Sequence, residues 1–132
     1  TMNEALDFIL KATETGNGSE IFIPKIKSYD MSTLVETLTE IFGEINQEIT
    51  GIRPGEKLHE TLINHNEIRY TWNVNDMYML SNPHHKLFNN HDLSELYDGI
   101  SKVENLTAYS SDVAEKITKE ELKNKIQESN LL

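Results

Sequence analysis

The order of apolar and polar positions predicts short, regular elements in the N-terminal half of the chain. Apolar residues recur at helical spacing over residues 2–15 and 34–42, and each run stops at a glycine, which is typical of a helix end. Short apolar runs at 20–23 and 48–52 predict strands. A Pro-Gly turn follows the second of these runs, and the spacing after it predicts a short helix over 57–63.

The pattern changes after residue 66. Apolar and polar residues alternate from Ile68 to Val74, and an extended pattern continues over 77–80, so we expect one or two half-buried strands here. The segment of about 81–106 is rich in Asn and His without a clean period, which predicts a loop with a short helix at 92–97. Thr118 and Glu121 form a capping box that predicts a last helix ending near residue 129.

These elements predict a single α/β domain over residues 1–132, with a small sheet and flanking helices. A chain of 132 residues can bury one core but is too short for a two-lobed dinucleotide enzyme. Because the first residue is Thr1 rather than Met, we expect the chain to be a piece of a longer protein.

Composition narrows the classes of partner. The chain has 22 acidic and 12 basic residues and a net charge of −10, which disfavours binding to nucleic acid or to anionic membranes. It has no cysteine, which excludes disulfides and cysteine-metal sites and fits a reducing compartment. No apolar run approaches the roughly 18 residues that span a bilayer, and no signal peptide is visible, so we expect a cytoplasmic protein.

The turn at residues 53–57, Arg-Pro-Gly-Glu-Lys, concentrates charge and backbone constraint. Pro54 biases Arg53 toward an extended conformation and Gly55 permits the bend, so Arg53 should end a strand and Glu56 should begin a helix. An arginine beside the free backbone N–H groups of a starting helix is a candidate anion site. The alternative is a tight turn with solvated charges, and the residues alone leave both open.

Other catalytic patterns are missing from the sequence. Gly16-Asn17-Gly18 follows a helix and lacks the third glycine of a dinucleotide loop, so we interpret it as a helix stop. No tyrosine has a lysine four residues later, and there is no Gly-x-Ser-x-Gly elbow.

The histidines of the chain are candidate metal ligands and, at His59, a candidate general base. Adjacent His84 and His85, with His91 and Asp92, suggest a metal site, but adjacent loop histidines rarely reach one ion, and we predict no metal. We interpret His59 as a partly buried structural residue rather than a general base.

Residues 51–62, GIRPGEKLHETL, resemble the C-terminal signature of the CapD-like UDP-N-acetylglucosamine 4,6-dehydratase and UDP-sugar 4-epimerase family of extended short-chain dehydrogenases. The stretches TMNEALDFILKA, EIFIPKI and AYSSDVAEKITKEEL are similar to other segments of that family. The resemblance covers most of the chain and is weakest over 81–106.

The resemblance implies a function for the charged turn. Enzymes of this family bind NAD(P) in an N-terminal Rossmann lobe, and their C-terminal lobe holds the nucleotide of a UDP-sugar that is oxidised at C4. The chain would then be the substrate-binding lobe without the Rossmann lobe. The resemblance assigns Arg53 to the diphosphate, Glu56 to the uridine ribose and Lys57 to a further phosphate contact.

The chain lacks two sequence motifs that enzymes of this family carry. Without the glycine loop and the Tyr/Lys pair, it should hold no catalytic residue and no cofactor, and NAD(P) is expected in the missing lobe. The expected partners are a UDP-sugar and a Rossmann lobe from the same gene or a separate chain, with a monomer in isolation. The residues do not distinguish dehydratase from epimerase. The alternative is a non-catalytic UDP-sugar-binding or protein-interaction module whose turn is purely structural.

A lobe cut from a larger protein should expose the apolar surface that met its partner. The residues we expect on this surface are Phe8, Leu10, Met77 and Met79.

Overall fold

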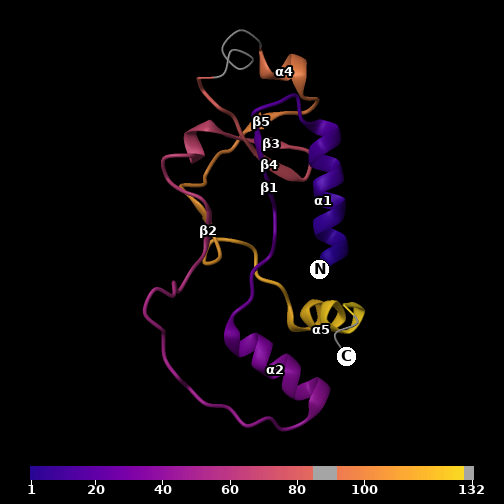
Figure 1. Ribbon diagram of the computed structural model, residues 1–132, viewed down its shortest axis with the longest axis vertical. Helices are drawn as coiled ribbons and strands as arrows, with labels where there is room; N and C mark the ends of the chain where they lie inside the picture. Colours follow the sequence, from indigo (N-terminus) through magenta and orange to yellow (C-terminus); the bar gives the residue numbers. More distant parts are fainter. Residues whose placement is uncertain (85–91, 130–132) are drawn as a thin grey trace. The chain divides into compact units, whose positions relative to one another are not determined.

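The computed structural model describes residues 1–84 and 92–129, which form two compact units (Figure 1). Unit 1 comprises Thr1, Ile26–Glu60 and Ser111–Leu132, and unit 2 comprises Met2–Lys25 and Thr61–Ser110. Helices and antiparallel sheets occur together, so the mixed α/β class predicted from the sequence is confirmed. None of the helices in the described ranges is long and apolar enough to cross a membrane.

A four-stranded antiparallel sheet forms the centre of unit 2, in the order β1-β4-β3-β5. Its strands are β1 (Ile21–Pro24), β3 (Thr71–Val74), β4 (Met77–Leu80) and β5 (Ser101–Lys102). The turn between β3 and β4 has only two residues, and Asn75 adopts a φ of 52° there, a conformation that asparagine tolerates well. A short 3₁₀ helix, η1 (Ile68–Tyr70), precedes β3.

Helix α1 (Met2–Thr15) runs beside this sheet (Figure 1). It ends at Gly16, whose N–H donates to the carbonyl of the preceding helical turn at 2.9 Å. The carboxylate of Glu20 then accepts from the N–H groups of Asn17 and Gly18 at 2.8 and 2.7 Å, which shapes the loop into β1. The helix and the strand were both predicted from the sequence, and the Gly-Asn-Gly segment is a helix stop.

The core of unit 2 contains Val74, Met79 and Tyr97, all almost fully buried. The partly buried residues packed against it are Phe22, Trp72, Leu93, Leu96 and Ile100. Two of them belong to α4 (Leu93–Leu96), where the Asp92 side chain caps the helix by accepting from the Ser94 N–H at 3.0 Å. The short helix expected within the irregular segment is therefore confirmed.

Unit 1 contains α2 (Met31–Phe42) and α5 (Lys119–Glu128), which pack against each other. An ion pair of 2.5 Å between Lys119 and Glu40 joins their exposed sides. The capping box of Thr118 and Glu121 is present, as predicted. Hydrogen bonds from Lys27 and then from Thr118 lower the pKa of the Glu121 carboxyl to about 2.

Two predicted elements are wrong. Residues 48–52 form no strand, and Ile49 is 98% exposed, because no strand within residues 1–84 and 92–129 pairs with this segment to supply the hydrogen bonds that an extended segment needs. The expected helix over 57–63 is replaced by an irregular segment with a bend at residues 58–59 and by β2 (Thr61–Ile63), which pairs with β6 (Tyr109–Ser110). Burial of Ile63 in that pairing outweighs the weak helical spacing of so short a segment.

The expected exposed apolar surface is correct only for Leu10, which is 61% exposed. Phe8 is half-buried, whereas Met77 and Met79 are buried on the inner face of β4. The alternating pattern of that strand points both methionines into the core of unit 2. The strand expected from residue 68 begins only at Thr71, after η1.

Candidate functional site

The charged turn is built on Arg53, Pro54, Gly55 and Glu56. The N–H of Glu56 donates to the carbonyl of Arg53 at 3.0 Å, which closes a four-residue turn. Pro54 holds the second position and Gly55, at a φ of 88°, holds the third, which is the pattern of a type II turn. The sequence therefore predicts this bend correctly.

The side chain of Glu56 folds back over the turn. One carboxylate oxygen accepts from the backbone N–H of Arg53 at 2.9 Å, and the other lies 3.8 Å from the Nε of Arg53. No helix begins here, and the N–H groups of both residues are already hydrogen-bonded within the turn. The expected anion site of free helical N–H groups is therefore wrong, and any attraction for an anion comes from the side chains.

Those side chains are accessible. The Arg53 side chain is 78% exposed, and Lys57 is exposed as well. Two cations and one carboxylate leave a net positive charge on residues 53–57, in a chain whose net charge is −10. A guanidinium offers a fork of N–H donors to phosphate oxygens, and a carboxylate has more acceptor positions than the Arg53 N–H uses. The turn can thus bind an anion beside a hydroxyl-bearing group.

The C-terminal flank of the turn is held by Ser111. Its hydroxyl accepts from the N–H of Glu60 at 3.1 Å, and its own N–H donates to the Glu60 carbonyl at 2.9 Å. The same hydroxyl lies 3.5 Å from the Nδ1 of His59. His59 is exposed, so the expectation of a partly buried histidine is wrong. Sequence reasoning did not single out Ser111, although it lies in the AYSSD stretch quoted for the resemblance.

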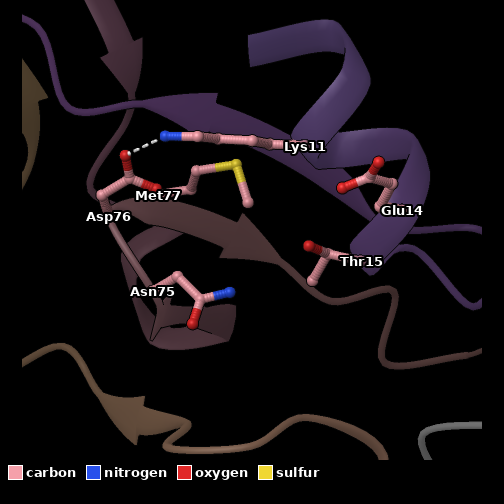
Figure 2. A pocket seen from close by; sticks show the side chains of 6 residues that line it. All are labelled: Lys11, Glu14, Thr15, Asn75, Asp76 and Met77. Atoms are coloured by element: carbon pink, nitrogen blue, oxygen red, sulfur yellow. Dashed lines mark hydrogen bonds and ion pairs between the residues drawn. The ribbon is translucent and has the colours of Figure 1, made fainter. Parts of the chain in front are cut away.

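Unit 2 contains a separate hollow of about 310 Å³ between the end of α1 and the β3–β4 turn (Figure 2). Lys11 extends across it to Asp76, with 2.8 Å between Nζ and the carboxylate. This hydrogen bond raises the pKa of Lys11 and lowers that of Asp76. Among the described residues that line the hollow, Lys11 is the one basic side chain and is paired, and Glu14 adds a second carboxylate, so the hollow is poorly suited to an anion.

The histidine-rich segment falls largely outside the described residues. His85 and His91 lie outside the described residues, and His84 and Asp92 are at the two ends of that gap. Within residues 1–84 and 92–129, no three His, Cys, Asp or Glu side chains gather closely enough to hold a metal ion.

Comparison with known proteins identifies relatives of the chain. The profile of a family described as "Polysaccharide biosynthesis protein" matches residues 1–82. A UDP-N-acetylglucosamine 4,6-dehydratase (inverting) from Campylobacter jejuni is 33% identical over 115 residues, which are 85% of this chain and 33% of that protein. A UDP-glucose 4-epimerase from Rickettsia rickettsii is 28% identical over 124 residues, or 91% of this chain and 35% of the relative.

The fold is also similar to a solved structure. The X-ray structure of Pen from Bacillus thuringiensis superposes with a TM-score of 0.79 at 29% identity, and the match covers 100% of this chain and 38% of that one. The chain thus spans about a third of the length of the curated relatives it matches.

Proposed function

The chain belongs to the polysaccharide biosynthesis protein family of extended short-chain dehydrogenases, and we propose that it is the part of such a protein that holds a UDP-sugar. The observation that carries this proposal is the turn at residues 53–57, where an exposed guanidinium, an exposed ammonium and a carboxylate with spare acceptor positions lie within five residues. The chain is the C-terminal substrate-binding lobe in this proposal.

The roles of the three side chains follow from their chemistry. Arg53 binds the diphosphate, because its planar fork of donors matches two phosphate oxygens. Lys57 supplies a second positive charge to the phosphates. Glu56 accepts hydrogen bonds from the ribose hydroxyls, and its contact with the Arg53 N–H keeps both charged groups in one fixed turn.

The names of the relatives support a role in holding UDP rather than in one reaction. A dehydratase and an epimerase both match most of this chain, and what their names share is a UDP-hexose. A segment common to two different reactions suits the part of the substrate that does not react. The choice between dehydration and epimerisation is therefore assigned to residues outside this chain.

In this proposal the chain itself holds no dinucleotide cofactor, and the Gly16-Asn17-Gly18 segment supports that part of the proposal. In the Gly16-Asn17-Gly18 segment, the N–H groups that would face a pyrophosphate are bound by the carboxylate of Glu20, which would repel it. We place NAD(P) in a Rossmann lobe supplied by the same gene or by a separate chain. The chain by itself should not turn over a UDP-sugar.

One specific observation favours the alternative function, in which the turn is purely structural. The N–H groups of Arg53 and Glu56 are satisfied internally, so the turn closes without any ligand. This is what a structural turn in a non-catalytic interaction module would require. The two readings differ in whether the exposed Arg53 side chain has a ligand.

The experiment that separates them is an NMR titration of the chain with UDP, with uridine as the matched ligand lacking phosphate. We expect saturable shifts of the amides at 53–57 with UDP at about millimolar concentration, or roughly −4 kcal/mol, and much smaller shifts with uridine. Equal responses to UDP and uridine, or no response to either, would contradict the proposal and favour the structural turn.

A further inference from the structure

Ser111 uses every polar group it has. Its N–H and hydroxyl hold both backbone groups of Glu60, at 2.9 and 3.1 Å, and the hydroxyl also faces the His59 ring. Since two backbone bonds and one ring contact converge on one residue, Ser111 determines where residues 59 and 60 lie. These residues follow the charged turn at residues 53–57 after one intervening residue, Leu58.

Ser111 is itself fixed from a third segment of unit 1. Its carbonyl accepts from the Ser28 hydroxyl at 2.7 Å and from the Lys116 Nζ at 3.2 Å. Ser28 is held in turn by backbone bonds, donating to the Glu115 carbonyl at 2.9 Å and accepting from the Ile117 N–H at 2.8 Å. The support of Ser111 thus does not depend on the charged turn.

The N-terminal flank of the turn differs from the C-terminal flank in its structure. Residues 44–52 carry neither a helix nor a strand, and Ile49 and Ile52 are exposed. Short loops without buried apolar contacts open easily. The geometry of Arg53 and Glu56 is therefore set within the turn and from its C-terminal side.

We propose that Ser111 is a positioning residue for the charged turn, acting through Glu60 and His59. It holds residues 59 and 60, two and three positions after Lys57, so that the side chains of Arg53 and Lys57 meet a diphosphate in one arrangement. This inference rests on the proposed UDP function. The Ser111 hydroxyl accepts from the Glu60 N–H and lies 3.5 Å from the His59 Nδ1, where either atom can donate, depending on the tautomer of the ring.

The test compares Ser111→Ala with Ser111→Thr, which keeps the hydroxyl, and with Ser28→Ala, which removes a hydroxyl from the same network without touching Glu60 or His59. Without ligand, Ser111→Ala should accelerate hydrogen exchange of the Glu60 N–H about fivefold and shift the ring-nitrogen resonances of His59. The threonine variant should resemble the wild type in both. Melting temperatures of all three show whether the fold is kept.

UDP binding supplies the second readout. The dissociation constant should rise about fivefold in Ser111→Ala and much less in Ser28→Ala, and Ser111→Thr should restore it. Unchanged Glu60 exchange and His59 resonances in Ser111→Ala would overturn the contact, and unchanged UDP affinity would overturn the positioning role. If the wild type bound no UDP, the proposed function would fail together with that role, while the ligand-free exchange would still report on the contact alone.

Discussion

The carboxylate of Glu56 accepts a hydrogen bond from the backbone N–H of Arg53 at 2.9 Å, and its second oxygen lies 3.8 Å from the Nε of the same residue. The acid thus closes the turn through the backbone while it faces the base through the side chain. The Arg53 side chain remains 78% exposed, so the ion pair is too solvated to neutralise it strongly. This arrangement leaves the guanidinium available to a ligand on a turn that is already formed.

Gly55 is the position where the turn is most sensitive to substitution. It adopts a φ of 88°, and an added Cβ would meet nothing within 4 Å, so the effect of Gly55→Ala is conformational rather than steric crowding by neighbours. We expect a cost of about 1–2 kcal/mol in closing the turn, measured as faster hydrogen exchange of the Glu56 N–H. Gly55→Asn is the matched control and should cost less, because asparagine tolerates positive φ. Equal exchange in Gly55→Ala and wild type would contradict the turn geometry.

Glu20 ties the end of α1 to the core of unit 2. Its carboxylate accepts from two backbone N–H groups, of Asn17 and Gly18, and from the hydroxyl of the buried Tyr97. Glu20→Ala should lower the free energy of unfolding by about 1–3 kcal/mol, because the loop and the hydroxyl lose their acceptor. Tyr97→Phe is the control that removes only the last contact, and denaturant unfolding should show a smaller loss. A larger loss in Tyr97→Phe would contradict this ranking.

The hydrogen-bonded pair of Glu20 and Tyr97 makes the free energy of unfolding depend on pH. Burial alone would raise the pKa of Glu20, but the hydrogen bond from Tyr97 and those from the backbone outweigh it and lower that pKa. A lowered carboxyl pKa contributes stability above the pKa of the unfolded chain, and this is lost as the pH falls through the folded value. Burial, and then Glu20, raises the pKa of Tyr97 to about 12, so its contribution is present below the unfolded pKa near 10 and lost as the pH rises toward 12.

Denaturant unfolding measured across the pH range checks both the loss of stability at acid pH (the acid limb) and the loss at alkaline pH (the alkaline limb). Glu20→Gln should flatten the acid limb relative to the wild type, since no carboxyl titrates at that position. Tyr97→Phe should likewise flatten the alkaline limb. An acid limb that is identical in Glu20→Gln and wild type would show that other carboxyls dominate.

Met79 lies at the centre of the unit 2 core and is 0% exposed. Met79→Ala should cost about 2–5 kcal/mol, because the removed atoms leave a cavity among Val74 and Tyr97. Leu10→Ala on α1 is the matched control, since Leu10 is 61% exposed and alanine is a good helix former. Its free energy of unfolding should change by less than about 0.5 kcal/mol. A comparable loss in both variants would mean that Leu10 is covered.

Sequence reasoning succeeded where the deciding contacts are local. The Thr118 and Glu121 capping box, the glycine after α1 and the Pro-Gly bend are each set by residues within a few positions of one another. It failed at residues 57–63, because the strand there depends on residues 109–110, far away in the chain. A helical spacing of a few residues carries less free energy than one buried strand pairing.

The sequence likewise predicts some features of the candidate site and not others. Arg53, Glu56 and Lys57 were singled out from their residue types and from the family resemblance, and the structure places all three on one exposed turn. The hydrogen bond from the Arg53 N–H to the Glu56 carboxylate and the contact between Ser111 and Glu60 could not be predicted from the sequence. The first depends on a side-chain rotamer, and the second joins segments 51 residues apart.

Calorimetric titration of the chain with UDP, beside Arg53→Ala and Arg53→Lys, tests whether the turn at residues 53–57 is a UDP site. We expect weak saturable binding by the wild type, loss in Arg53→Ala and partial retention in Arg53→Lys, because lysine keeps the charge without the fork. Equal affinity in the wild type and Arg53→Ala, or no heat with the wild type, would contradict this expectation.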